Sequence, residues 1–395
     1  MIAKRLSAIL VAGLPLVYSA CGGGDLTLPS EGEPATIAVL SGDGQNGRVG
    51  TQLIAPLVVK VTDTQSRPVG GATVNFVFDD VSAASAAPAT TGANGEASSS
   101  ITLGSRVGVV TGHATVPVPA GRVPVTIPFT ATAVPSDANG IAEVSGNDQT
   151  GAVGTALALP LVVQVSDAFG NPIAGVPVSW TTPDGGSFSE SSTQTGANGQ
   201  ASVTWTLGTT AGAQTALASA EDLVGSPVTF NATATAGSAE RVEIVSGNDQ
   251  SGAPGTQLPL PLVVRVLDAQ NNPIIGRAVT WVPGTTSGTV TPQSSNTDDQ
   301  GHASTQWTLP SSPGDYTVTA VFSGAGTATA RFTGHATSGS PSASTSTVSA
   351  SPTTITAGSG TSTITVRVRD ANGSSLSGVS VTLVASGSSN TIAPA

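Results

Sequence analysis

One short pattern occurs four times along the 395-residue chain and constrains the fold more than any other feature. An aspartate ends a run of alternating apolar residues, and a glycine follows eight positions later, just before another apolar run. The aspartates are Asp63, Asp167, Asp268 and Asp370, at intervals of 104, 101 and 102 residues. A repeat of this length, built from short extended segments, predicts a string of similar β domains rather than one large fold or a short-repeat solenoid.

The apolar residues before each aspartate recur at every second position. Leu57, Val59 and Val61 fall on one side of an extended chain, and Val58 and Lys60 fall on the other. This periodicity is typical of a strand that buries one face. Between the aspartate and the glycine stand turn formers such as glycine, asparagine and proline, so each interval predicts a tight corner. We interpret the four aspartates as turn formers with no catalytic role.

A second phrase, Thr-Gly-Ala-Asn-Gly, begins at Thr91 and Thr195, and a related copy begins at Thr297. The first two copies contain an Asn-Gly step, which accepts positive φ and therefore predicts a β-hairpin, and the third copy has Gln-Gly in its place. The alternating segments add up to about seven strands per repeat, the number in an immunoglobulin-type sandwich. The tryptophans share the parity of their inward-facing neighbours, which favours core packing over a sugar-binding platform. They are Trp180, Trp205, Trp281 and Trp307.

Taken in order, these phrases resemble the bacterial immunoglobulin-like domains of group 1, the repeat units of the intimin and invasin adhesins. The resemblance extends from about residue 35 to residue 395. It implies an all-β fold of tandem immunoglobulin-like β-sandwiches arranged as beads on a string. The β-barrel and the lectin-like tip of those adhesins have no counterpart in this sequence, so adhesion does not follow from the resemblance alone.

The N-terminus has the features of an export signal. Lys4 and Arg5 precede a short apolar run, and small residues lead to Cys21, the single cysteine of the chain. The run is too short for a membrane span and predicts a secretory signal. Its end resembles a bacterial lipoprotein signal, which implies that Cys21 is the lipid anchor and the only membrane contact. Tyr18 stands where that pattern prefers leucine, so secretion after ordinary cleavage is the alternative.

The repeat spacing and the linkers predict the division of the chain. The parts are a signal peptide (1–20), a Gly-rich tether (21–34), Ig-like domains at 35–134, 137–236 and 238–336, a Ser-rich linker (337–345) and a truncated fourth domain (346–395). The fourth copy reaches residue 395 before its second phrase is due, so we expect it to be poorly packed, in a truncated chain.

Charge and histidine placement argue against several function classes. The chain has 24 acidic and 13 basic residues and a net charge of −11, without the clustered basic face of a nucleic-acid-binding protein. His113, His302 and His335 occupy non-equivalent positions, and no spacing suggests a catalytic triad. We therefore expect no nucleic-acid partner, no enzymatic activity and no cofactor.

Two polar loops are weak candidates for calcium sites, at Asp148 and Asp249. Calcium takes six to eight oxygen ligands, usually several of them carboxylates, and each loop offers one. A polar turn is the favoured interpretation, and no metal site is expected.

The sequence thus predicts a non-enzymatic protein of the outer membrane or cell surface, an extended stalk that serves adhesion or presents a distal module. One alternative is a binding module that acts through loops at the sandwich ends. Another is the spacer of a surface enzyme whose catalytic domain lies beyond residue 395. The sequence names no surface ligand or protein partner.

Overall fold

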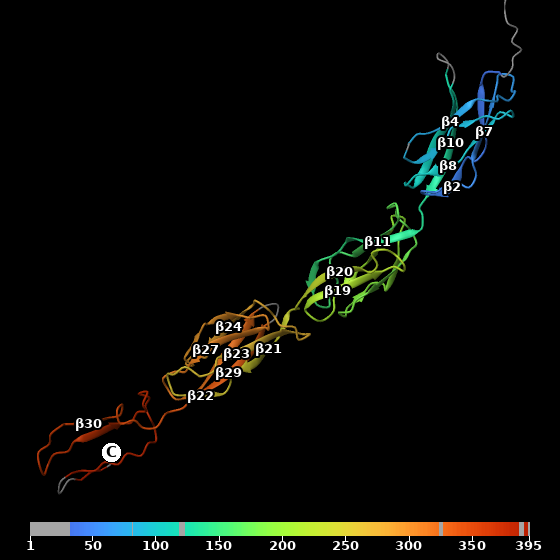
Figure 1. Ribbon diagram of the computed structural model, residues 1–395. Helices are drawn as coiled ribbons and strands as arrows, with labels where there is room; N and C mark the ends of the chain where they lie inside the picture. The colour runs from blue at the N-terminus through green and yellow to red at the C-terminus, as the bar shows by residue number, and fades with distance from the viewer. Residues whose placement is uncertain (1–31, 81, 118–122, 324–326, 387–390, 394–395) are drawn as a thin grey trace, which may run out of the picture. The chain divides into compact units, whose positions relative to one another are not determined.

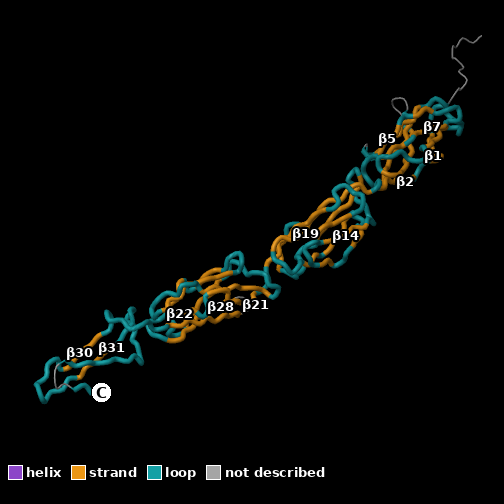
Figure 2. The backbone as a smooth tube through the Cα atoms, turned by 60° about the horizontal axis from the view of Figure 1, so that its bottom comes forward, coloured by secondary structure: helices purple, strands orange, loops and turns teal. Residues whose placement is uncertain are grey.

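The computed structural model describes residues 32–80, 82–117, 123–323, 327–386 and 391–393. Within these ranges every regular element is a β-strand (Figure 1; Figure 2), which confirms the predicted all-β class. The chain forms two compact units. Unit 1 runs to Asp137 and also includes Asp167–Asn171, and unit 2 consists of Ala138–Ser166 and Pro172–Ala395.

Unit 1 contains a sandwich of two sheets. Its strands are β1 Thr36–Ser41, β2 Gln45–Arg48, β3 Leu57–Thr62, β4 Thr73–Phe78, β5 Ala84–Ala86, β6 Ala89–Thr90, β7 Glu96–Ser99, β8 Ile101–Leu103, β9 Gly108–Val116 and β10 Val125–Val134. One sheet has the order β1-β3-β7 and the other β2-β10-β9-β4-β6, while β5 pairs with β8. The segments outnumber the seven expected strands partly because the first strand changes sheets: β1 pairs antiparallel with β3, and β2 pairs parallel with β10.

A glycine makes that change of sheet possible. Gly42, between β1 and β2, has a φ of 88°, and a Cβ there would lie 2.3 Å from the Pro56 carbonyl oxygen. Only glycine combines this dihedral with so close a backbone approach. Gly146 and Gly247 occupy the same place in the next two repeats, with φ of 97° and 89°. The first strand therefore switches sheets in the same way each time.

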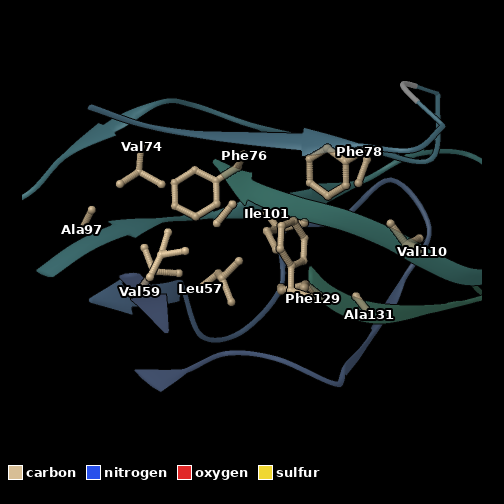
Figure 3. Close-up of a cluster of buried hydrophobic side chains, with 14 of the residues drawn as sticks. Leu57, Val59, Val74, Phe76, Phe78, Ala97, Ile101, Val110, Phe129 and Ala131 are labelled. Atoms are coloured by element: carbon tan, nitrogen blue, oxygen red, sulfur yellow. The ribbon is translucent and has the colours of Figure 1, made fainter. Parts of the chain in front are cut away.

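The core of unit 1 lies between its two sheets. Figure 3 shows Phe76 and Phe78 of β4 directed toward Leu57 of β3 and Phe129 of β10. The rings of Phe78 and Phe129 meet edge to face, with centroids 5.5 Å apart. Each large apolar side chain buried in this way contributes about 1.5–3 kcal/mol to the folded state. Leu57 and Val59 are fully buried, as their alternation in the sequence predicts.

Unit 2 begins with a second sandwich. Its strands are β11 Ala138–Ser145, β12 Gln149–Ala152, β13 Leu161–Asp167, β14 Pro177–Thr181, β15 Ser187–Phe188, β16 Ser192–Gln194, β17 Gln200–Val203, β18 Trp205–Thr206, β19 Gly212–Ser219 and β20 Val228–Thr235. The sheet orders are β11-β13-β17 and β12-β20-β19-β14-β16, with β15 paired to β18. This arrangement repeats that of unit 1 strand for strand.

A third sandwich follows within unit 2 (Figure 1). Its strands are β21 Ala239–Ser246, β22 Gln250–Gly252, β23 Leu262–Asp268, β24 Ala278–Pro283, β25 Thr289–Thr291, β26 Ser294–Asn296, β27 His302–Thr308, β28 Gly314–Ser323 and β29 Thr327–Ala336. The sheets have the orders β21-β23-β27-β25 and β22-β29-β28-β24-β26. Each sandwich has a separate cluster of buried apolar side chains.

The Asn-Gly phrase does not form the predicted hairpin. β6 and β7 flank its first copy, but β6 pairs with β4 in one sheet and β7 pairs with β3 in the other. Gly95 alone takes positive φ, and the Asn94 side chain accepts a hydrogen bond from the Glu96 N–H at 3.1 Å. The hairpin prediction was wrong because the turn chemistry fixes a local bend and does not determine which strands pair. The second and third copies cross between the sheets in the same way.

The residues from 346 onward form a simpler structure. β30 Thr347–Ser351 pairs antiparallel with β31 Thr363–Arg367. Among the described residues of this segment, none belongs to the three buried apolar clusters. Val348 is 69% exposed and Val384 is 88% exposed. Large apolar side chains of this segment thus face solvent.

Candidate functional site: the aspartate corner

Every repeat carries the same hydrogen-bonded corner, built around the recurrent aspartate. In the third sandwich, Asp268 ends β23 and its Oδ1 accepts hydrogen bonds from the N–H of Gln270 at 2.9 Å and of Asn272 at 2.8 Å. The other three aspartates accept equivalent bonds from the residues two and four positions later. All four carboxylates are buried. The structure therefore places each predicted turn former at the turn itself.

In the second, third and fourth repeats the second carboxylate oxygen holds the segment that leads into the repeat, whereas Asp63 Oδ2 accepts a hydrogen bond from Arg67 Nε at 2.8 Å. Asp268 Oδ2 accepts a hydrogen bond from the Gly237 N–H at 2.8 Å, and Asp370 Oδ2 accepts one from Gly339 at 3.1 Å. The Ser136 N–H donates to Asp167 in the same manner. One carboxylate oxygen accepts the bonds of the corner and the other accepts the bond from the entering chain. The aspartate is therefore used for both of its acceptor oxygens.

The donors around the carboxylate control its ionisation. Burial by itself would raise the pKa of Asp268. Hydrogen bonds from the Asn272 side chain and from the N–H groups of Gly237, Asn272 and Gln270 outweigh that effect and hold the pKa of Asp268 below its usual value. The same balance lowers the pKa of Asp167. Both carboxylates are charged at neutral pH, and each charge is stabilised by hydrogen bonds from backbone N–H groups and from one asparagine side chain.

A buried threonine connects the corner to the second recurrent phrase. Thr195 Oγ1 accepts a hydrogen bond from the Val176 N–H at 2.9 Å and donates to the Ile173 carbonyl at 2.7 Å. Gly175, with a φ of 78°, lies between these partners. The sequence analysis missed this threonine, although it opens every copy of the phrase, at Thr91, Thr195 and Thr297.

The calcium candidates lie in the turns where the first strand changes sheets. Asp148 and Asp249 both have a φ of 54°. Beside Asp148, Gln149 Nε2 donates to the carbonyls of Gly146 and Leu159, at 2.7 and 2.9 Å, and its Oε1 accepts from the Leu159 N–H at 2.9 Å. Across the described residues, no group of three or more His, Cys, Asp or Glu side chains is arranged to hold a metal ion. In the loop at Asp148 the Gln149 side chain joins two backbone segments by hydrogen bonds.

The three histidines each lie near one aspartate at the surface. His335 Nδ1 is 2.7 Å from Asp315, and His113 Nδ1 is 3.2 Å from Asp79. His302 is 3.9 Å from Asp298. Asp79 also accepts a hydrogen bond from the Thr111 hydroxyl. That hydroxyl contacts the acid, whereas in a hydrolytic triad the nucleophile contacts the base, which the acid in turn orients.

The four tryptophans lie in the cores of the second and third sandwiches, each at most 2% exposed. Trp180 packs against Phe230 with ring centroids 6.2 Å apart. Trp307 Nε1 donates to the Ser287 carbonyl at 2.7 Å. Their aromatic faces contact protein and offer no platform to a sugar.

The proposed anchor, Cys21, and the signal peptide lie outside the residues that the structure describes. In the part of the chain that it does describe, no helix has the length and apolarity needed to cross a membrane.

Residues 147–233 and 241–334 match the family described as bacterial Ig-like domain (group 1). The second and third sandwiches are bacterial Ig-like domains of group 1. The matched ranges fall in the second and third sandwiches, and the domain type predicted from the sequence is confirmed. No curated protein sequence matches this tandem Ig-like chain.

The solved structures to which the chain is similar have low sequence identity to it. A solved chain of the Escherichia coli adhesin FdeC is 18% identical, with 77% of this chain and 99% of that chain covered and a TM-score of 0.49. InvD of Yersinia pseudotuberculosis is 15% identical, with coverage of 76% and 96% and a TM-score of 0.44. Invasin, a bacterial integrin-binding protein, is 20% identical, with coverage of 75% and 59% and a TM-score of 0.39.

Proposed function

We propose that this protein is a non-enzymatic, exported surface protein whose Ig-like domains form a stalk. The stalk holds an adhesive or interaction module away from the cell, and a lipid on Cys21 anchors it to the outer membrane. The observation that carries the proposal is the repetition of closed sandwiches, each with a separate buried core. Repetition of one self-contained unit adds length without adding chemistry.

The use of the polar residues supports the same role. The buried aspartates, the recurrent threonine and the recurrent glutamine all bond to nearby backbone. The tryptophans are packed inside the sandwiches. These polar and aromatic side chains therefore stabilise the fold. This use favours a spacer over a binding module.

Deletion or replacement of one whole Ig-like domain tests the proposal that the domains form a stalk. An epitope tag placed after Ala395 is read with an antibody on intact cells that express the full chain. Deletion of residues 137–236 should reduce antibody access, because the tag then lies closer to the envelope. Replacement of those residues by a second copy of 238–336 should restore access. A stalk role is contradicted if the deletion leaves access unchanged at equal expression.

The same pair of chains separates the stalk from a binding module. If the loops of the second sandwich bind a ligand, the replacement chain keeps its length but loses adherence of the cells to their target. If the repeats act as a spacer, the replacement chain keeps both.

Labelling of cells with a radioactive fatty acid tests the anchor. We expect incorporation into the full chain and none into Cys21→Ser, with the variant released from the membrane fraction. Equal membrane retention of both proteins would contradict the anchor and leave the stalk proposal standing.

A further inference from the structure

In unit 2, one asparagine joins the corner of the third sandwich to the sandwich before it. Asn272 Nδ2 donates to the Thr209 carbonyl at 2.9 Å, and the Ala211 N–H donates to Asn272 Oδ1 at 2.8 Å. Asn272 is 6% exposed, and its Nδ2 also donates to Asp268 Oδ2 at 2.9 Å. The corner carboxylate thus orients an amide that pairs in both directions with a loop of the other sandwich.

The receiving loop between β18 and β19 is itself held in place. Gln214 is 2% exposed, its Oε1 accepts from the Gly208 N–H at 2.8 Å, and its Nε2 donates to the Thr210 carbonyl at 2.7 Å. Both sides of the contact are therefore ordered before they meet, which lowers the conformational entropy lost in forming it.

The same contact occurs inside unit 1, with a longer second bond. Asn171 Nδ2 donates to the Ser105 carbonyl at 2.8 Å, and the Val107 N–H lies 3.4 Å from Asn171 Oδ1. Asn171 also donates to Asp167 Oδ2 at 2.9 Å. An asparagine four positions after the corner aspartate thus meets an equivalent loop in both places.

The fourth corner differs at both ends of this contact. Ser374 replaces the asparagine, and its hydroxyl lies 3.4 Å from the Ser311 carbonyl. Pro313 stands where Ala211 stands in the second sandwich and has no N–H to donate. The loop itself is still held, because Tyr316 Oη donates to the Ser312 carbonyl at 2.8 Å. Two substitutions therefore remove the two-way pairing and leave one long contact.

We infer that, within unit 2, the residue four positions after Asp268 and after Asp370 sets the stiffness of the junction before that corner. Asn272 fixes the second and third sandwiches at one angle, whereas Ser374 with Pro313 leaves residues 346–395 free to turn on the third sandwich. The inference concerns the angle between domains and is independent of the proposed surface role. Failure of either one leaves the other intact.

Pulsed electron–electron distance measurements on the full chain test this inference. In a Cys21→Ser background, spin labels at Ser202→Cys and Ser304→Cys report on the junction of the second and third sandwiches. Labels at Ser304→Cys and Ser349→Cys report on the junction that follows. All three positions are exposed on strands and lie outside the junction contacts. We expect a narrow distance distribution for the first pair and a broad one for the second.

Two variants then break the junction from opposite sides. Asn272→Ser should broaden the first distribution toward the width of the second. Ala211→Pro should do the same without any change in the third sandwich, and a proline already occupies the equivalent place in that sandwich. If Asn272→Ser fails to fold, as judged by the near-ultraviolet dichroism of the tryptophans, Ala211→Pro carries the test.

Restoration provides the converse experiment. Pro313→Ala combined with Ser374→Asn should narrow the second distribution. The inference is overturned if Ala211→Pro leaves the first distribution unchanged, or if the unmodified chain gives equal widths at the two junctions.

Discussion

The corner at Asp268 and the corner at Asp370 are built alike, but they belong to regions that pack very differently. Each carboxylate is at most 1% exposed, accepts two N–H bonds from its own turn and accepts one from the entering chain. The Asp268 corner ends a strand whose sheet covers buried tryptophans, whereas the segment around Asp370 leaves Val348 and Val384 exposed. The comparison teaches that the corner is a local device, while the core requires strands that come much later in the sequence.

Removal of a core tryptophan should have the largest effect. Trp307→Ala deletes a fully buried ring and should destabilise the third sandwich by about 3–5 kcal/mol, through lost burial and the cavity left behind. Denaturant unfolding followed by circular dichroism measures the change. The matched control is Val348→Ala in the terminal segment, which should stay within about 0.5 kcal/mol because that side chain faces solvent. Equal losses in both variants would show that the two regions pack alike.

Neutralisation of the corner aspartate should come next. Asp268→Asn turns one acceptor oxygen into a donor that faces the Gly237 N–H, and should cost the third sandwich about 1.5–3 kcal/mol. The unfolding midpoint of the third sandwich gives the value. Asp370→Asn makes the same change at the other corner and should leave that midpoint where it was. A shift from Asp370→Asn as large as that from Asp268→Asn would break the distinction between the two regions.

Lowering the pH should remove the stabilisation that the charged Asp268 carboxylate provides, without any mutation. The pKa of Asp268 is lower in the folded chain than in the unfolded chain, so the folded state gains stability above the unfolded pKa, which is about 3.9. That stability is lost as the pH falls through the folded pKa. Unfolding free energies measured below about pH 4 should therefore decline more steeply for the natural chain than for Asp268→Asn. Parallel pH profiles for the two chains would contradict this role of the carboxylate.

The smallest expected effect comes from the threonine of the second phrase. Thr297 Oγ1 accepts a hydrogen bond from the Arg277 N–H at 3.0 Å, and Thr297→Val should cost about 1 kcal/mol. Thr280→Val, on the exposed face of β24, serves as the control and should be neutral in the same unfolding assay. The pair sharpens the comparison because residues 346–395 contain no copy of this phrase. No difference between Thr297→Val and Thr280→Val would remove the threonine from the account.

Much of this fold could be predicted because alternate residues of a strand face opposite sides, so apolar residues at every second position indicate one buried face. Leu57, Val59 and Val61 alternate in the sequence and are all fully buried. The parity of the tryptophans likewise matches their positions in the cores. The Asp-to-Gly interval indicated a turn because those residue types bond to nearby backbone or accept positive φ.

What the sequence did not reveal depends on which residues contact one another in the folded chain. The Asn-Gly phrase specifies a bend, but pairing of the flanking strands with β3 and β4 is decided by the two sheets. The three bonds of Gln149 and the buried hydroxyl of Thr195 involve partners 3 to 22 positions away. Their only signal in the sequence is recurrence at the repeat interval.

Hydrogen exchange of the native full chain tests most directly the claim that the corner is local and the core is not. We expect the amides of β23, β27 and β28 to exchange slowly and together, through unfolding of the whole third sandwich. The amides of β30 and β31 should exchange much faster, although the Asp370 corner is formed. Exchange of β30 and β31 as slow as that of β23 would contradict the account, because it would mean that the terminal segment has a stable core.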